Sequence, residues 1–303
     1  MFNATFSSGF NHTNSSTNLR TSGGRLLWYL YPECASAPYC FAFYYGAKVF
    51  NLFLGTPCNI LVIWQIATKK TNSSTSDIFF FNLALIDAFF CLMTPIDLLN
   101  RMVYDNKFIW YIQRLAYGLK DLSPFFLVCI CLDRYMAVVH PVLYSGYRDK
   151  NARVVVCVVV WVLMLPYSIT KSILGILSVT DIFSGVILFA FAVMVFCNIS
   201  VVWVLRRSVA GKEVMHPVKK KAFKMVMKNL AIIVVNYLPP VAIMPFLSYF
   251  TVVDYLCFIS ISVFGIMDLS CSIEPLLYIT KMEKVDAICC RQSISENPPE
   301  ANG

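Results

Sequence analysis

Charged side chains interrupt the apolar runs of this 303-residue chain, and they are the residues best able to do chemistry. A charge surrounded by hydrocarbon costs several kcal/mol unless it is paired or faces water, so each one marks a packing pair or a functional site. So many internal charges favour a polar cavity over pairs that only fix helix packing. These charged residues are Asp87, Asp97, Lys120, Asp121, Asp133, Arg134, Asp268 and Glu274.

The motifs of the chain offer little for catalysis. An enzyme would need a nucleophile beside a positioned base, or a cluster of metal ligands, and neither is evident. No CxxC or Cys/His metal spacing appears, and the three histidines are scattered. We therefore expect a protein that is not an enzyme.

The elements that carry these charges are long apolar runs. The chain is 58% hydrophobic and 14% charged, which is typical of a membrane protein. A helix that crosses the hydrocarbon needs roughly 20 apolar residues. The runs are too long for barrel strands and lack a period of two, so the sequence predicts an all-α fold, a bundle of seven transmembrane helices. The runs are Phe41–Thr68, Ile78–Met102, Ile109–Val139, Val154–Ile176, Ile182–Leu205, Met225–Tyr249 and Val252–Thr280.

The basic residues between these runs predict the orientation. They concentrate in loops that a seven-span layout puts on one side, and the positive-inside rule makes that side cytoplasmic. A nucleic-acid partner is the weaker interpretation of the lysine cluster between the fifth and sixth spans. The start of the chain has no basic region followed by an apolar one, so we expect no cleaved signal peptide and an N-terminus outside.

The domain organisation follows from this topology. We expect an extracellular tail at residues 1–40, a bundle at 41–280, and a short amphipathic helix and tail at 281–303. The tail carries glycosylation sequons at Asn3, Asn11 and Asn14. Cys289 and Cys290 follow the last span, where palmitoylation and two free thiols are equally good interpretations.

Three of the twelve cysteines could face the oxidising side. They are Cys34, Cys40 and Cys257, and a disulfide among them is plausible although three cannot all pair. Most of the others lie within spans, where we expect them to act as packing residues.

Several ordered motifs resemble the rhodopsin-like (class A) G-protein-coupled receptors. They are "NLALID" in the second run, "LDRYMAVVHP" closing the third, Trp161 in the fourth, "NYLPP" in the sixth and "SCSIEPLLY" in the seventh, together with Asn59 in the first. The closing motif is most similar to the branch with chemokine, nucleotide, and small carboxylate or lipid receptors. The chain departs from the family's pattern at Ile109, where a cysteine is usual, and in its activation connector.

The resemblance implies a switch at the cytoplasmic end of the bundle. Arg134 would be held by Asp133 at rest and exposed to a heterotrimeric G protein on activation, when the sixth helix moves. The other residues that the resemblance assigns to this switch are Tyr135, Pro239, Glu274, Pro275 and Tyr278. Arrestin is a lesser expected partner, and membrane lipid surrounds the bundle.

The resemblance also implies a ligand cavity and a cation site. A sodium ion would be coordinated by Asp87, Ser123, Ser270 and Glu274. Ala116 stands where amine receptors carry an aspartate, and the seventh span has no lysine for retinal, so an extracellular ligand of another class is expected. An anion or lipid is one alternative, and peptide or chemosensory ligands are the others. The predicted ligand-binding residues are Asp97, Arg101, Gln113, Tyr117, Lys120, Asp121, Tyr237 and Asp268.

The family resemblance also leads us to expect one particular ion pair. Counting helix rise from the cytoplasmic motifs puts Lys120 and Asp268 at facing depths of the third and seventh spans. A lysine there needs a carboxylate, so we predict that these two residues pair and set the resting state. Two alternatives to a G-protein-coupled receptor stay open. They are a constitutive or decoy receptor-like protein, and a transporter that uses the acids as an ion path.

Overall fold

The computed structural model describes residues 38–68, 76–146, 150–175, 180–207, 217–243, 246, 249–251 and 254–280. Every regular element in these ranges is helical. Seven helices are long and apolar enough to cross a membrane, which confirms the predicted all-α bundle. They are Tyr39–Thr68, Asp77–Leu99, Lys107–Val139, Asn151–Leu174, Ile182–Arg207, Val226–Ile243 and Cys257–Thr280.

Several spans are assembled from more than one helical element. The first contains α1 (Pro38–Phe50), η3 (Asn51–Gly55) and α2 (Thr56–Thr68). The second contains α3 (Asp77–Leu92) and α4 (Thr94–Leu99), followed by η4 (Asn100–Tyr104). The third contains α5 (Lys107–Lys120) and α6 (Ser123–Val139), followed by α7 (Pro141–Gly146). The rest are α8 (Lys150–Leu174), α9 (Thr180–Arg207), α10 (Pro217–Ile243), η7 (Tyr255–Ser260), α12 (Ile261–Asp268) and a helix over 270–280.

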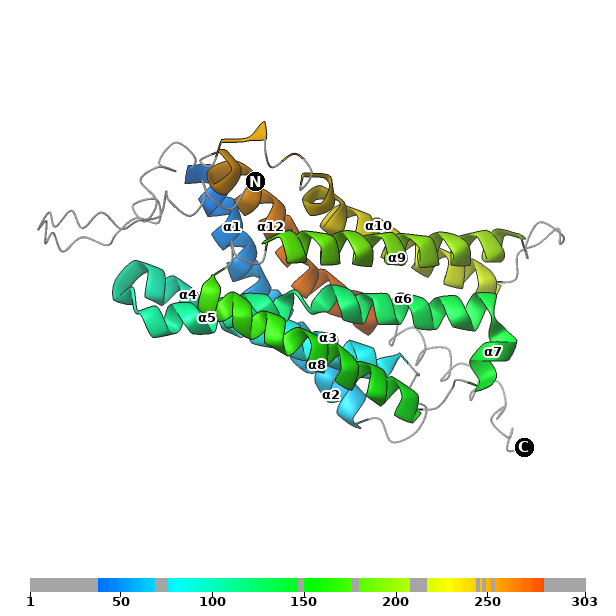
Figure 1. The fold of residues 1–303 in the computed structure, drawn as a ribbon. Helices are drawn as coiled ribbons and strands as arrows, with labels where there is room; N and C mark the ends of the chain where they lie inside the picture. The colour runs from blue at the N-terminus through cyan, green and yellow to red at the C-terminus, as the bar shows by residue number, and fades with distance from the viewer. Residues whose placement is uncertain are drawn as a thin grey trace, which may run out of the picture.

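The spans lie side by side along one direction, with α4 and α5 at one end of the bundle and α7 at the other (Figure 1). α6 packs against α3 and α9, α10 packs against α9 and α12, and α1 packs against α12. The core between them includes Leu122, Phe126 and Met194, whereas the outward-facing Phe53 and Trp64 are largely exposed. An apolar exterior around an apolar core is what a hydrocarbon solvent permits.

Two proline-linked breaks interrupt the spans that carry the internal charges. Pro124 has no N–H to give the Lys120 carbonyl, so α5 ends at Lys120 and α6 begins at Ser123. Between the two helices, the Leu122 N–H donates to the Leu119 carbonyl at 3.0 Å. α3 likewise ends at Leu92, shortly before Pro95 in α4. The break in the third span sets Lys120 and Asp121 at a helix end in the middle of the bundle.

A third break, at Leu269, frees carbonyls of the seventh span, and two asparagines of the first span satisfy them. Pro275 cannot donate to the Cys271 carbonyl, which accepts from Asn59 Nδ2 at 2.8 Å instead. The Asp268 carbonyl accepts from Asn51 Nδ2 at 2.7 Å. Since lipid offers no donor to a freed carbonyl, these contacts join the first and seventh spans.

Close packing of α5 against α8 depends on the absence of a side chain at Gly118. A methyl group there would lie 2.8 Å from Ser168 Cα, whereas one at Gly46 would meet no atom within 4 Å. We expect Gly118→Ala to lower the free energy of unfolding by about 1–3 kcal/mol. Gly46→Ala is the matched control, and should be neutral or stabilise by up to about 1 kcal/mol. Thermal unfolding of the purified variants measures both; equal melting temperatures would contradict the packing.

Candidate functional site

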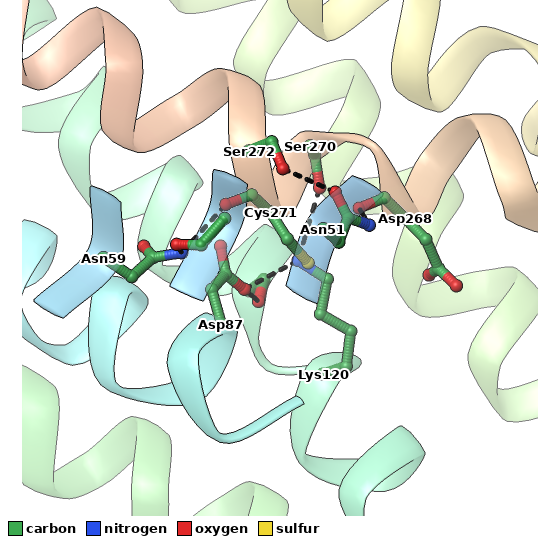
Figure 2. Close-up of polar contacts among 10 residues, drawn as sticks. Asn51, Asn59, Asp87, Lys120, Asp268, Ser270, Cys271 and Ser272 are labelled. Carbon is green, nitrogen blue, oxygen red and sulfur yellow. Dashed lines mark hydrogen bonds and ion pairs between the residues drawn. The ribbon is translucent and has the colours of Figure 1, made fainter. Parts of the chain in front are cut away.

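A buried polar group, here called the central cluster, joins the second, third and seventh spans. Its members are Asp87, Lys120, Ser123 and Ser270, none of which is more than 4% exposed. Lys120 Nζ donates to Asp87 Oδ1 at 2.7 Å and to Ser270 Oγ at 3.3 Å (Figure 2). Ser123 Oγ donates to the same Asp87 oxygen at 3.1 Å. The break between α5 and α6 allows Lys120 and Ser123 to reach Asp87 together.

The expected ion pair between Lys120 and Asp268 is wrong. The Lys120 ammonium binds Asp87 of α3, and Figure 2 shows the Asp268 carboxylate apart from it. Counting helix rise gave the right depth, but it could not reveal the break at Leu269 that turns Asp268 elsewhere. Asp268 is 3% exposed, and its Oδ2 has no hydrogen-bond partner among the described residues.

A second group, here called the lysine–tyrosine cluster, lies toward the α4–α5 end of the bundle. Its members are Tyr44, Lys48, Phe90, Asp97, Gln113 and Tyr117. Lys48 Nζ lies 3.4 Å from Asp97 Oδ2 and 4.7 Å from the centre of the Tyr117 ring. Gln113 Nε2 donates to Asp97 Oδ1. Lys48 is thus stabilised both by one carboxylate and by the aromatic faces around it.

Sequence reasoning placed Asp97, Gln113 and Tyr117 together, but it missed Lys48 and Tyr44. Lys48 is 3% exposed within the first span, and the hydroxyls of Tyr44 and Tyr117 lie 2.6 Å apart. The rule that intramembrane charges are functional candidates applies to Lys48 as well and would have found it.

The remaining predicted ligand residues do not join this cluster. Asp121 Oδ2 accepts from Lys171 Nζ at 2.6 Å and from Tyr167 Oη at 2.7 Å, so it faces α8. Lys171 lies within α8. Tyr237 is buried in the apolar core, and the side chain of Arg101 lies outside the described residues.

Asp133 does not hold Arg134, contrary to expectation. Its Oδ1 accepts from Arg153 at 2.9 Å, and its Oδ2 accepts from Ser76 Oγ at 2.5 Å. Tyr144 Oη also donates to Asp133 at 3.4 Å. Arg134 makes no ion pair within the part of the chain that the structure describes. The reason is geometric: neighbouring residues of a helix point about 100° apart, whereas Arg153 of α8 faces Asp133 directly.

The other predicted switch residues lie near the same end of the bundle, in the seventh span or, for Pro239, late in the sixth span. Tyr278 Oη donates to Asp77 Oδ1 at 3.1 Å, and its ring packs on Phe80. Tyr135 packs against Phe196. α10 continues past Pro239 to Ile243.

Comparison with known proteins bears on what this arrangement is. Residues 58–181 match the family model described as "7 transmembrane receptor (rhodopsin family)". Proteinase-activated receptor 3 of Homo sapiens is 31% identical over 127 residues, which are 39% of this chain and 34% of that protein. G-protein coupled receptor 35 of Homo sapiens is 29% identical over 205 residues, covering 62% of this chain and 65% of that protein. Atypical chemokine receptor 3 of Rattus norvegicus is 28% identical over 145 residues, covering 43% of this chain and 38% of that protein.

Over residues 58–181 the chain is similar to the rhodopsin-like (class A) receptor family. Together with the seven apolar helices, this similarity indicates a multi-pass membrane protein. The chain spans only about a third of the length of the first of these relatives.

Several predicted sites of this chain lie outside the described residues. They are Asn3, Asn11, Asn14, Cys34, Cys289 and Cys290, with the tail at 281–303. Of the described cysteines proposed for a disulfide, Cys257 is disulfide-bonded and Cys40 is free.

The pairing of Asp133 can be measured with a double-mutant cycle in thermal unfolding. We expect Asp133→Asn and Arg153→Gln to couple by about 0.5–3 kcal/mol, because each change removes the same buried contact. The matched cycle of Asp133→Asn with Arg134→Gln should give a smaller coupling, since these side chains do not pair. A larger coupling in the second cycle would instead indicate that Asp133 pairs with Arg134, as the family resemblance implied.

Proposed function

We propose that this chain is a plasma-membrane receptor that binds an extracellular ligand and activates a heterotrimeric G protein. The observation that carries the proposal is the state of Arg134, at the end of the third span beside α7. Its neighbouring acid is occupied by Arg153, so the Arg134 guanidinium has no carboxylate bound among the described residues. A planar cation with five donors is well suited to the carbonyls and carboxylates of a protein partner.

Orientation supports the same proposal. The basic loops between the spans fall on the side of Arg134, which the positive-inside rule makes cytoplasmic, and the N-terminus is then outside. The lysine–tyrosine cluster lies toward the opposite end and is the proposed ligand site. The arginine and the cluster would therefore face the two compartments that a receptor connects.

The ion pairs narrow the chemistry of the ligand. Lys120 and Lys171 are each bound to an aspartate at 2.6–2.7 Å, which leaves them poorly placed to receive an anion. Lys48 lies farther from its aspartate, at 3.4 Å, and is a basic residue that a ligand could engage by competing with Asp97. We propose a ligand that combines an acceptor for Lys48 with a flat group that stacks on Tyr44 or Tyr117. An amine transmitter and retinal remain disfavoured, because Ala116 and the seventh span lack the residues they need.

Two alternatives are weaker. A transporter would need an ion path through the bundle, whereas three of the internal acids are closed by lysines. A constitutive or decoy protein would share the fold. Ligand-stimulated nucleotide exchange on a G protein distinguishes a receptor from such a protein. A receptor role also agrees with the absence of a catalytic motif in the sequence.

Two secondary proposals concern the end of the chain. They are arrestin binding through Ser293 and Ser295, and lipid anchoring at Cys289 and Cys290.

The role of Arg134 is tested by nucleotide exchange on a purified G protein, at matched surface expression. We expect Arg134→Ala to reduce exchange by about tenfold or more, because loss of one partner in a buried charge contact costs about 2–5 kcal/mol. Lys107→Ala is the control, since Lys107 is exposed at the start of α5, at the other end of the third span. Unchanged exchange by Arg134→Ala would remove the proposal's main support.

A further inference from the structure

The residues that the family resemblance assigns to a sodium ion already hold a cation of this chain. The Lys120 ammonium lies 2.7 Å from Asp87 Oδ1 and 3.3 Å from Ser270 Oγ. These are two of the oxygens that a sodium ion would need. Ser123 Oγ, which would supply a third, is hydrogen-bonded to the same Asp87 oxygen at 3.1 Å. The residues present therefore do not fit a sodium ion.

Charge and burial reinforce this geometry. Lys120 is 4% exposed and Asp87 is fully buried, so the two charges neutralise each other without water. A second cation at the same oxygens would lie a few ångströms from the ammonium, where repulsion is strong because little water screens it. A lysine nitrogen is also a point charge with three donors, and the oxygens of Asp87 and Ser270 accept two of them.

The space beside the cluster is too small to offer a second site. Asp87 Oδ2 and Glu274 Oε2 have no hydrogen-bond partner among the described residues. Both residues line a cavity with Asn59, Leu83 and Tyr278, which has room for about one water molecule. A hard cation requires a shell of several oxygen ligands, and the other residues that line this cavity are mostly apolar. A water between the two carboxyl groups fits this space better than an ion with its ligands.

We propose that the Lys120 ammonium is a covalently attached cation that takes the place of a sodium ion, and that the bundle does not bind sodium. A sodium ion can leave, and its occupancy follows the salt outside the cell. The lysine cannot leave, so it links the end of α5 to α3 and to the helix over 270–280 at every salt concentration. This inference concerns the bundle itself and does not depend on G-protein coupling.

The test measures the melting temperature of the purified full chain in detergent, in sodium chloride and in choline chloride at equal ionic strength. We expect the wild-type melting temperature to be the same in both salts. Lys120→Met removes the ammonium and keeps the side chain's length, so it leaves Asp87 Oδ1 and Ser270 Oγ without their cation, beside Ser123 Oγ. We expect sodium to raise the melting temperature of this variant by about 2–4 °C, as a ligand at a few times its dissociation constant does for a chain of this size.

Lys171→Met is the matched control. It breaks an equally short and buried pair, in which Asp121 lies at 2.6 Å and keeps the Tyr167 hydroxyl as a donor at 2.7 Å. We expect this variant to be destabilised and to show no specific response to sodium. Adding Asp87→Asn to Lys120→Met should abolish the response, because the carboxylate that would bind the ion is lost.

Two results would overturn the proposal. One is a sodium-specific rise in the melting temperature of the wild-type chain. This measurement does not depend on whether any variant folds. The other is a folded Lys120→Met chain that ignores sodium. Lys120→Gln, which keeps a donor toward Asp87, is the second variant if Lys120→Met does not fold, and a sodium response there supports the proposal equally.

Discussion

The contact of 2.7 Å between Lys120 and Asp87 is buried away from bulk solvent, and much of the bundle is arranged around it. A lone ammonium or carboxylate in that position would be strongly unfavourable, so each requires the other. The contact ties α5 to α3, and Ser270 brings the seventh span to the same point. Three spans that are far apart in the sequence are thereby held in one register.

The breaks in these spans make that contact feasible. Pro124 ends α5 at Lys120, and the following turn brings Ser123 to the same carboxylate. A break inside a membrane frees backbone carbonyls that must find donors. In the seventh span those donors are Asn51 and Asn59 of the first. The same irregular backbone that positions the central cluster therefore also joins the first and seventh spans.

The ion pairs of the bundle occupy most of the acids discussed above, and this pairing decides which other polar groups stay available. Lys48, Lys120 and Lys171 each bind one aspartate, and Asp268 is left with an unpaired oxygen. Asp133 binds Arg153 and leaves Arg134 available. Charge pairing thus does more than fix helix packing, since it determines which polar groups remain for a ligand and for a protein partner. In the proposed function, the lysine–tyrosine cluster and Arg134, near opposite ends of the bundle, are those groups.

The sequence by itself determined the class of fold, because the length and apolar character of seven runs leave no alternative to membrane-spanning helices. It also identified several of the buried charges, since a charge in such a run is conspicuous, but it did not single out the buried Lys48, Asp77, Arg153 and Lys171. Only the tertiary structure decided which charges pair. Asp268 was the wrong partner for Lys120, and Arg153 replaced Arg134 at Asp133, because pairing depends on helix breaks and on the facing of neighbouring spans. Spacing along one chain fixes depth within a helix, whereas the direction in which a side chain points across the bundle is a property of the packed whole.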